Sequence, residues 1–446
     1  MSRRNMLLLT VTAMVSYLCY VRGEQNPYAR YVAGGYSIID RWALQDTPDQ
    51  ELFEGAMQGM VSVLQKRGDE HSLFINEEQR DIFREELTQE FGGIGVRIRQ
   101  LGDPPQLTIV GPPEPGTPAF DADIRSGDRI VALDGKPTAN MEMIEVLKIM
   151  RGTAGQQVVL SITHQGEETV HEIALTRAVI TVESIRGDLR QPDGTWLFQL
   201  ESDLRIGYLR ITSFGDKTEE ELAKALDLLC GPAAKNRVEA LILDVRDNYG
   251  GALDAAVGIS DLFLRAGLPI VSTRGRDQVT RDRFVSTGSG GYTTQPLAIL
   301  INHNSASAAE ILAACLQDYN RAVVIGQRSF GKGTVQRLVR IESGRSLLKL
   351  TSATYWRPSG KNIHRMPGDS DTDPWGVSPN EGFQVVLDDK EYLEWRHYRR
   401  RRDLIGNSDQ SPLAMQIDKE DGKPPESYVD RAFEKARDYL AATLDQ

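Results

Sequence analysis

Short runs of apolar residues alternate with helical patterns in the second half of the chain, and this alternation constrains the fold more than any other feature. The runs are Ala240 to Val245, Leu297 to Ile301 and Ala322 to Ile325. Apolar strands that are separated by helices pair in parallel and are buried on both faces. We therefore expect an α/β core whose parallel sheet is covered on both faces. Its other predicted elements are a strand over Arg205 to Ile211 and helices over Thr218 to Cys230, Leu253 to Leu264 and Ala306 to Gln317.

Three loops leave the carboxyl edge of this predicted sheet, which is where parallel sheets bind ligands. They are residues 246–251, 302–307 and 326–333. The last two loops belong to one strand–helix–strand crossover. Because such crossovers are right-handed, Lys332 should return beside Ser307. A hydroxyl, an amine and a glycine-rich loop are therefore expected to converge.

Ser307 and Lys332 have the chemistry of a nucleophile and its base. A serine hydroxyl attacks well only when a neighbouring group takes its proton. A lysine can take it if its pKa falls from about 10.4 to about 7–8, which requires a dry site without a nearby carboxylate. The flanking Phe330, Gly331 and Gly333 fit such a site, and Gln336 could hold the amine in line without adding charge.

An oxyanion in this chemistry would be stabilised by backbone N–H groups. The candidates are the N–H of Ala308, at the helix start, and one from Gly250 or Gly251. Each feature alone also has a structural interpretation, since Ser307 to Glu310 fits a helix capping box and the two glycines fit a tight turn. Their shared edge of the sheet is what favours the catalytic interpretation.

Two other chemistries match part of the pattern. Gly326 to Lys332 resembles the opening of a phosphate-binding loop, but Gly333 stands where Ser or Thr would bind magnesium, and a strand pattern follows where a helix is needed. A Ser-His-Asp arrangement is the second rival. Its available side chains are His303, His364, Asp244 and Asp247. We interpret His303 as incidental to the chemistry.

A mostly β region precedes the predicted core. Between Gly92 and about Ala178, short alternating runs separated by turns indicate strands, among them Gly95 to Arg99. Gly111 to Pro118 is rich in proline and glycine and indicates a loop, and Met143 to Met150 indicates one helix. This region is long enough for a compact domain of about 90 residues.

Helical patterns dominate both ends of the chain. Apolar spacings of three and four residues from Ser37 to Phe91 indicate helices before the β region, and Tyr428 to Leu444 indicates one at the end. Arg396 and Arg399 to Arg402 form a short basic run. We interpret this run as the solvated face of a helix.

The extreme N-terminus has the pattern of an export signal. Arg3 and Arg4 precede an apolar run from Met6 to Val21, which is slightly shorter than the roughly 20 residues that span a bilayer. No small-residue cleavage site follows, so we favour an uncleaved anchor over a cleaved signal. Positive-inside logic then places the rest of the chain outside the cytoplasm, at the membrane or in the periplasm.

Composition excludes several classes of protein. The chain has 52 Lys and Arg against 63 Asp and Glu, a net charge of −11, which argues against nucleic-acid binding. Its 3 cysteines lie far apart and give no metal-ligand spacing. The pattern calls for no metal or cofactor, and it leaves open whether the chain forms homo-oligomers.

The residues around the serine and the lysine resemble a known family. The segments Asn304 to Ile311 and Phe330 to Gln336 are similar to the motifs of the carboxyl-terminal processing peptidases, also called tail-specific proteases. In that family the serine matching Ser307 is the nucleophile, the lysine matching Lys332 is the general base, and the glutamine matching Gln336 orients the lysine. The intervals of 25 residues from serine to lysine and of four from lysine to glutamine fit the family pattern.

Further segments extend the resemblance. Leu243 to Gly251 resembles the family's oxyanion loop, with Tyr249 where a smaller residue or proline is common. Phe91 to Val96 and Ser126 to Gly135 resemble the PDZ domain that these enzymes insert before the protease core. His364 stands in another family segment, at a position where glutamine is usual.

The resemblance implies that the PDZ domain binds the C-terminal tails of protein substrates. Backbone N–H groups of a glycine loop capture a carboxylate, and the adjoining strand edge takes the peptide. The residues at the matching positions are Gly93, Ile94, Gly95 and Val96. Arg151, after the predicted PDZ helix, is a candidate for coupling tail binding to the protease site.

These features together predict a serine endopeptidase that cleaves near the C-terminus of proteins. The implied fold is a ClpP/crotonase-like parallel-sheet core with an inserted PDZ domain and helical N- and C-terminal segments. The expected boundaries are 1–24 for the signal or anchor, 28–90 for the N-terminal helices, 91–178 for the PDZ domain, 179–388 for the core and 389–446 for the C-terminal helices. The alternative is an inactive PDZ scaffold on a protease fold.

Overall fold

The structure is a computed structural model that describes most of the chain. The residues described are 5–6, 10–17, 27–111, 113, 116–191, 193–232, 234, 236–366, 368–404 and 428–446. They divide into one unit of Met1–Glu78 with Arg337–Thr351 and a second of Gln79–Gln336 with Ser352–Gln446. All the predicted catalytic and tail-binding residues belong to the second unit.

The first unit consists of helices and a β-ribbon. Its elements are α2 (Pro27–Trp42), α3 (Asp49–Gln65), β1 (Leu73–Ile75), the end of β19 (Thr334–Ile341), the 3-10 helix η1 (Glu342–Gly344) and the start of β20 (Ser346–Trp356). The apolar spacing after Pro48 predicted α3, and the structure confirms this helix. Strand β1 pairs antiparallel with β20, with Phe74 opposite Leu348.

The N-terminal run that we interpret as a signal or anchor lies only partly within the described residues. Residues 10–17 of it are helical. In the part of the chain that the structure describes, no helix combines the length and the apolar character needed to span a membrane.

A β-rich domain follows helix α4 (Glu77–Thr88), as predicted. Its elements are β2 (Glu90–Gly93), β3 (Ile98–Leu101), β4 (Gln106–Ile109), α5 (Pro118–Asp121), β5 (Arg129–Leu133), β6 (Lys136–Pro137), α6 (Met143–Met150), β7 (Gln157–Thr163), β8 (His171–Thr176) and β9 (Ala178–Thr181). Strands β3, β4, β5, β7 and β8 form one sheet in that order, and β2 pairs with β9. The fully buried side chains Ile109, Val146 and Leu160 share one core.

One boundary in this domain differs from the prediction. The strand expected from Gly95 begins only at Ile98. Gly95 has a φ of +83°, which turns the chain away from the extended conformation. The glycine therefore belongs to a loop and does not start a strand.

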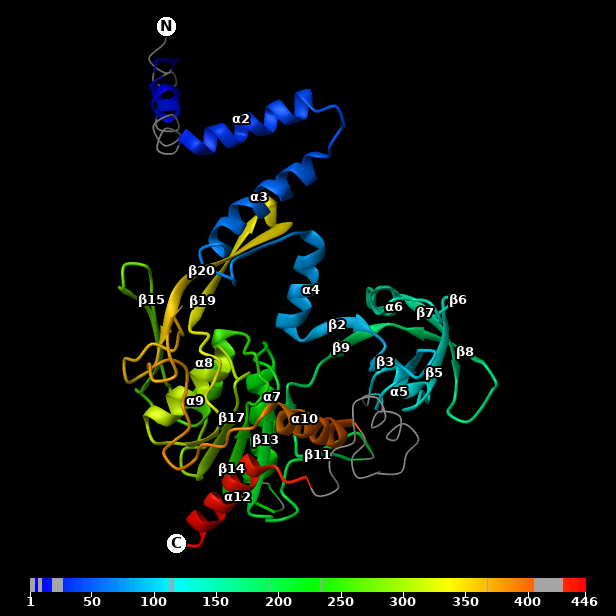
Figure 1. The fold of residues 1–446 in the computed structure, drawn as a ribbon, viewed down its shortest axis with the longest axis vertical. Coiled ribbons are helices and arrows are strands. Elements are labelled where there is room, and N and C mark those ends of the chain that lie inside the picture. Colours follow the sequence, from blue (N-terminus) through cyan, green and yellow to red (C-terminus); the bar gives the residue numbers. More distant parts are fainter. Residues whose placement is uncertain are drawn as a thin grey trace. The chain divides into compact units, whose positions relative to one another are not determined.

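The core sheet is parallel, as the apolar runs predicted (Figure 1). Its strands lie in the order β10 (Ile185–Arg186), β13 (Ile206–Ile211), β14 (Ala240–Asp244), β17 (Leu297–Ile301) and β18 (Val323–Gly326). The last four pair in parallel, with Leu243 opposite Ile299 and Ile299 opposite Val324. Only the two-residue β10 at the edge is antiparallel.

Alternate strand residues point to opposite faces of the sheet. Helices pack against the buried residues on both faces. Leu241 and Leu243 pack in one core with α7 (Thr218–Cys230), α8 (Leu253–Leu262) and α9 (Ala308–Asp318). Ala240 and Ile242 pack in another with α12 (Arg431–Leu444), the red helix in Figure 1. The carboxyl edge of the sheet remains for the loops after β14, β17 and β18.

The remaining elements surround this core. They are β11 (Leu189–Arg190), β12 (Trp196–Leu197), β15 (Pro269–Arg274), β16 (Thr280–Val285) and α10 (Asp389–Leu404). The end of β20 pairs with β15, which in turn pairs with β16.

Helix α10 carries the basic run that we interpret from the sequence as a solvated face, and that interpretation is wrong for part of it. Arg399 is only 4% exposed. Its guanidinium bonds the carboxylate of Asp188 at 3.0 Å, and Arg402 bonds the same carboxylate. The run therefore faces partly inward, toward acidic partners far away in the sequence.

Candidate active site

Ser307 stands at the start of α9, directly after the loop that leaves β17. Its backbone has φ 57° and ψ −114°, a combination that L residues rarely adopt. Such strain persists only where surrounding contacts enforce it, and it is concentrated at functional sites. The residue is 9% exposed, so this strained turn is almost fully enclosed.

Gly250, in the loop after β14, lies against this serine. A Cβ atom at Gly250 would be 2.8 Å from Cβ of Ser307 and 2.9 Å from N of Ala308. Carbon atoms do not approach that closely, and Gly250 also has a φ of +97°. Only glycine fits here, and the loops after β14 and β17 therefore converge, as their shared edge of the sheet predicted.

Glu310, in the first turn of α9, joins the serine loop to the lysine loop. Its Oε2 accepts hydrogen bonds from the backbone N–H groups of Ser307 and Lys332, each at 2.8 Å. Its Oε1 accepts from the N–H of Gly331 at 2.7 Å and from the hydroxyl of Ser329 at 2.6 Å. One fully buried carboxylate thus fixes the main chain on both sides of the site.

This carboxylate corrects an expectation from the sequence. We expected no acidic group near Lys332, yet Glu310 bonds the backbone of that residue. Burial raises the pKa of Glu310 to about 7, although its four hydrogen-bond donors favour the charged form and oppose the shift. The carboxyl group therefore changes charge near neutral pH.

The structure confirms the capping-box interpretation, because Ser307 is the N-cap of α9 and forms a capping box with Glu310. The side chain of Glu310 accepts from the N–H of Ser307, as in a capping box. The N–H of Glu310 in turn donates to the carbonyl oxygen of Ser307 at 2.9 Å. Ser307 and Glu310 therefore begin helix α9 together.

The loop that carries Lys332 is packed between glycines. A Cβ atom at Gly331 would be 2.9 Å from the ring of Trp375, and one at Gly333 would collide with the backbone of His364. Trp375 is itself buried. The two flanking glycines let neighbouring segments close over the main chain of the lysine.

Two residues near this loop have surroundings that the sequence did not specify. The side-chain amide of Gln336 donates to the hydroxyl of Thr334 at 3.1 Å, on the same face of β19. Phe330, which we expected in a dry wall, is 52% exposed. The tight packing around Lys332 therefore comes from the glycines and not from this aromatic ring.

The loops after β14 and β17 are bonded to each other. Asp247 accepts from the side-chain amides of Asn302 at 2.8 Å and Asn304 at 3.0 Å, and from the hydroxyl of Tyr392 at 2.9 Å. The N–H of Ala306 donates to the carbonyl oxygen of Asn248. These bonds hold the glycine loop and the loop of Ser307 in a fixed position relative to each other.

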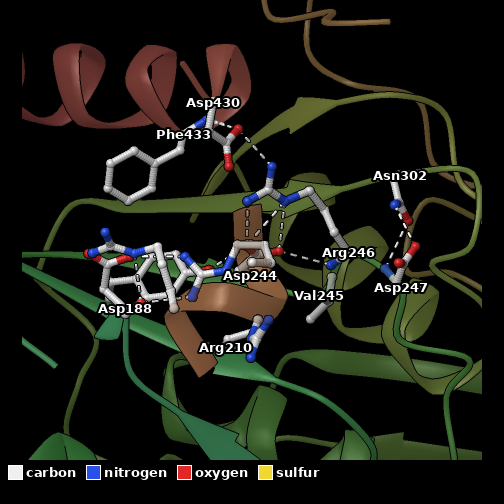
Figure 2. Close-up of polar contacts among 12 residues, drawn as sticks. Asp188, Arg210, Asp244, Val245, Arg246, Asp247, Asn302, Asp430 and Phe433 are labelled. Atoms are coloured by element: carbon white, nitrogen blue, oxygen red, sulfur yellow. Dashed lines mark hydrogen bonds and ion pairs between the residues drawn. The ribbon is translucent and has the colours of Figure 1, made fainter. Parts of the chain in front are cut away.

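Arg246, at the start of the glycine loop, lies between two buried carboxylates (Figure 2). It bonds Asp244 at 2.6 Å and Asp430 at 2.9 Å, and Tyr208 donates to Asp244 at 2.6 Å. Asp430 is also the N-cap of α12 and accepts from the N–H of Phe433. Asp244 therefore serves this ion-pair network, which makes it unsuited to orient a catalytic histidine.

The two glycines of the loop differ in their bonding. The N–H of Gly250 donates to the side-chain oxygen of Asn248 at 2.8 Å. Gly251, with φ +148°, packs its backbone against that of Phe214. The N–H of Gly250 would therefore have to break its bond to Asn248 before it could donate to an oxyanion.

The histidines have other contacts. The ring of His303 packs edge-on against Tyr392 with centroids 4.8 Å apart, and its Nδ1 lies 3.4 Å from the side chain of Gln327. Burial lowers the pKa of His364, whose N–H bonds Asn362. The interpretation of His303 as incidental to the chemistry stays a prediction.

The predicted tail-binding segment forms a loop between β2 and β3. The carbonyl oxygen of Ile94 accepts from the N–H of Ala119, and Gly95 lies so close to Thr117 that a Cβ atom would collide with it. Gly93 ends β2, and Val96 lies in the loop. The conformation of this loop therefore depends on a glycine at position 95.

Arg151 contacts the first strand of this domain and the helix that precedes it. Its guanidinium bonds Glu85 of α4 at 3.0 Å and lies 4.9 Å from the ring centre of Phe91. Glu85 lies in α4, which precedes β2, and Phe91 lies in β2. The described contacts of Arg151 therefore fix it beside the PDZ domain's first strand.

Sequence reasoning did not identify Glu310, Asp247 or Asp430 as parts of the site. The capping-box spacing predicted Glu310 as a residue of the helix start. The same spacing implies that its side chain bonds the main chain of Ser307, and this signal could have identified Glu310 as part of the site. Asp247 was considered only as a partner for histidine. Asp430 had no sequence signal beyond preceding a helix.

Comparisons with known proteins agree with the motifs. Residues 205–380 match the model of peptidase family S41, and residues 109–163 match the PDZ domain model. The carboxy-terminal-processing protease of Bartonella bacilliformis is 33% identical over 420 residues, which cover 91% of this chain and 89% of that protein. The carboxyl-terminal-processing protease of Synechocystis sp. is 31% identical over 350 residues, 78% of this chain and 75% of that protein.

The matched S41 region holds Ser307, Lys332 and the glycine loop. The predicted PDZ domain and the α/β protease core are thereby confirmed. The chain belongs to the carboxy-terminal-processing proteases of peptidase family S41, a family of serine-type endopeptidases.

Proposed function

We propose that Ser307 is the nucleophile and Lys332 the general base of this peptidase. The observation that carries the proposal is the bonding of both residues' backbones to one carboxylate oxygen of Glu310. This arrangement brings the serine loop and the lysine loop together, and the strained turn at Ser307 holds the residue in a fixed conformation.

Acylation follows from these roles. Neutral Lys332 takes the proton of the Ser307 hydroxyl while the oxygen forms a bond to the scissile carbonyl carbon. The carbonyl oxygen becomes an oxyanion, which the N–H groups of Ala308 and Gly251 stabilise; we favour Gly251 because the N–H of Gly250 already bonds Asn248. As the tetrahedral intermediate collapses, the C–N bond breaks and the protonated lysine gives its proton to the leaving amine.

Deacylation reverses the proton path. Lys332 takes a proton from a water molecule as the water oxygen attacks the acyl carbon. The second oxyanion collapses, the bond to the serine oxygen breaks, and the lysine returns its proton to Ser307. Gln336 orients the amine in this scheme, with its own amide supported by Thr334.

The PDZ domain supplies specificity for chain ends. A substrate carboxylate binds the N–H groups of the Gly93 to Val96 loop, and the tail extends the sheet beside it. Because the tail that the PDZ domain binds is also the tail that is cut, cleavage occurs near the C-terminus of the substrate. Arg151, bonded to Glu85 beside the first PDZ strand, is positioned to couple tail binding to the linker before the domain.

Two substitutions test the dyad. Ser307→Ala and Lys332→Ala should each abolish hydrolysis of a peptide with a free C-terminus, and a fluorophosphonate probe should label wild type at Ser307. His303→Ala and His364→Ala serve as controls and should keep measurable activity. Full activity in the lysine variant, or loss in both histidine variants, would redirect the assignment to a histidine base. Absence of probe labelling in wild type would favour the inactive scaffold.

We also propose that the N-terminal run anchors the protein outside the cytoplasm. Arg3 and Arg4 before the apolar residues support this orientation. Membrane fractionation and protease accessibility of the full chain test it. Deletion of residues 1–24 should release the protein from the membrane fraction, and sequencing of the mature N-terminus distinguishes an anchor from a cleaved signal.

A further inference from the structure

An irregular segment of the protease core packs against the loop that carries Lys332. It comprises residues 363–366 and 368–377, which lie between β20 and α10 in the chain and belong to no described helix or strand. We call these residues the cover segment. Because no helix or sheet ladder fixes the cover segment, other parts of the protein have to bond its main-chain groups.

The ends of the cover segment are bonded to the lysine loop. Near one end, the N–H of Arg365 donates to the carbonyl oxygen of Gly331 at 2.8 Å. At the other end, the carbonyl oxygen of Val377 accepts from the N–H of Ser329 at 3.0 Å, and the N–H of Val377 donates to the hydroxyl of the same serine at 2.7 Å. The cover segment therefore begins and ends on the residues just before Lys332.

Two residues of the cover segment lie against the glycines that flank Lys332. Trp375 is 7% exposed, and a Cβ atom at Gly331 would be 2.9 Å from its ring. On the other side, the main chain of His364 lies against Gly333. Lys332 is itself partly buried. The cover segment thus supplies the close packing around this loop.

Arg328, four residues before Lys332, holds the middle of the cover segment. Its guanidinium donates to the carbonyl oxygens of Asp371 at 2.7 Å and Trp375 at 2.6 Å, and also to that of Asp373. Its central carbon lies 3.5 Å from the ring centre of Trp375, a cation–π contact. One side chain therefore fixes three main-chain carbonyl groups and the ring that packs beside Gly331.

This bonding requires an arginine. A guanidinium presents five N–H donors in a rigid plane, so that it can serve several acceptors at once. A lysine at position 328 would keep the positive charge, but its single ammonium group is a compact donor on a flexible stem and cannot reproduce the planar fork. The change from arginine to lysine therefore separates the geometry of the side chain from its charge.

We propose that Arg328 is a positioning residue for the reaction, because it keeps the cover segment closed over the lysine loop and so excludes water from the amine of Lys332. The inference rests on the proposed role of Lys332 as general base. Exclusion of water favours the neutral amine, which is the form that can accept a proton. Loss of the Arg328 bonds would admit water and raise the pKa of the amine towards its ordinary value of about 10.4.

Other charged and titratable groups surround the same loop. They are Glu310 of α9, Arg328 of the loop itself, and His364, Arg365, Asp369, Asp371 and Asp373 of the cover segment. All of them except the substituted residue are retained in every variant below. A shift that appears in one variant and not in its control therefore does not come from these groups.

Competitive labelling measures the ionisation of Lys332 without relying on peptidase activity. The full chain is treated with trace acetic anhydride at a series of pH values, and acetylation of Lys332 is measured by mass spectrometry of its peptide. We expect the wild-type amine to titrate at about pH 7–8. Arg328→Lys should raise this midpoint by about one pH unit or more, because water reaches the amine while the nearby charge is kept.

The pH profile of kcat/KM gives a second measurement. Its ascending limb reports the base of the free enzyme, so this limb should move to higher pH by the same amount. Activity of Arg328→Lys should therefore be about tenfold lower than wild type at pH 7 and within about twofold of it at pH 9.5. A purely structural loss would lower the activity equally at both pH values.

Arg321→Lys is the matched control. The guanidinium of Arg321 also donates to three main-chain carbonyl oxygens, those of Phe263, Gln295 and Tyr292. Arg321 precedes β18, whereas the lysine loop follows that strand. This variant should lose stability in the same way as Arg328→Lys, but the midpoint of Lys332 should stay within about 0.3 pH units of wild type.

Trp375→Leu keeps the proposal testable if Arg328→Lys does not fold. This substitution removes the ring beside Gly331 and leaves the main-chain carbonyl groups that Arg328 bonds. It should raise the midpoint of Lys332 by about half a pH unit or more, since the smaller side chain leaves space for water. Circular dichroism and the unfolding temperature show which variants are folded.

The possible failures are distinguishable. Titration of wild-type Lys332 near pH 10 would overturn its role as the base, and the inference with it. A low midpoint in wild type that stays unchanged in folded Arg328→Lys and Trp375→Leu would overturn only the role of the cover segment. An equal shift in Arg321→Lys would also overturn that role, because general loosening of the core would then explain the effect.

Discussion

The backbone N–H groups of Ser307 and Lys332 donate to the same oxygen, Oε2 of Glu310, each over 2.8 Å. The two residues are 25 positions apart and leave different strands of the sheet. A single buried carboxylate therefore sets the distance between the loop of the proposed nucleophile and that of its base. Such a shared acceptor is a positioning device, because it touches the main chain and not the reacting atoms.

Glu310→Gln should lower kcat at pH 8 by about 100-fold or more while leaving KM nearly unchanged. A glutamine side chain presents an NH2 group to one of the two pairs of donors, so two hydrogen bonds are lost and the loops shift. Misplacement of about 1 Å costs this much in rate. Steady-state kinetics on a C-terminal peptide measure the effect.

The matched control for this substitution is Glu220→Gln. Glu220 is exposed on α7 and pairs only with Lys224 among the described ion pairs. This variant should keep wild-type kinetics. If Glu310→Gln also kept them, Glu310 would have no positioning role.

The stability of the protein should report the ionisation of Glu310. The folded-state pKa of about 7 lies above the usual value of 4.5, so the stabilising contribution of the protonated carboxyl is present below about pH 4.5 and is lost as the pH rises to 7. Relative to Glu310→Gln, which cannot ionise, wild type should lose about 3 kcal/mol of unfolding free energy over this range. Urea unfolding of both proteins at several pH values measures the difference. A constant difference across that range contradicts the raised pKa.

Gly250→Ala should remove activity from a folded protein. The added methyl would push against Cβ of Ser307 and N of Ala308, both within 3 Å. We expect kcat to fall by about 100-fold or more, with reduced labelling of Ser307 by a fluorophosphonate probe.

Gly267→Ala separates this clash from the cost of backbone conformation. Gly267 also has a positive φ, +88°, but no atom lies within 4 Å of the place that an added methyl would occupy. That variant should lose about 1 kcal/mol of stability and keep its kcat. Equal loss of activity in both glycine variants would mean that strain, and not contact with the serine, explains the effect.

Local patterns predicted the elements of the core because those elements are locally determined. The apolar strands of the sheet and the helix at Thr218 appear where their periodicity placed them. The convergence of the serine and lysine loops also followed, since the handedness of one crossover leaves little choice. Sequence patterns therefore predicted the strands and helices of the core and the chemical groups that single motifs carry.

Features that depend on distant partners could not be predicted. Arg399 is buried because it bonds Asp188, which is 211 positions earlier in the chain. Without that partner the pattern of α10 fits a solvated helix equally well. The role of Glu310 depends on four donors from two loops, and a capping-box spacing reports only one of them.

Asp430→Ala should destabilise the protein by about 3–5 kcal/mol. The substitution leaves Arg246 with one of its two buried carboxylates and removes the N-cap of α12. Asp430→Asn keeps an oxygen that can accept from both groups and removes only the charge, so it should cost about 1 kcal/mol less because the cap survives. Urea unfolding of both variants measures these costs. Equal stability of both variants with wild type would show that the network contributes nothing to the fold.

Tail recognition by the PDZ domain should depend on Gly95. This glycine has a φ of +83° and lies against Thr117, so Gly95→Ala would distort the carboxylate-binding loop. We expect KM for a substrate with a free C-terminus to rise about tenfold, while the rate with the same peptide amidated at its end, which lacks the carboxylate, stays as in wild type. Gly135→Ala is the matched control, since Gly135 has a φ of +76° in the same domain with nothing within 4 Å. A rise in KM with both substrates, or in both variants, would mean that the loop supports the domain's fold and does not bind the carboxylate.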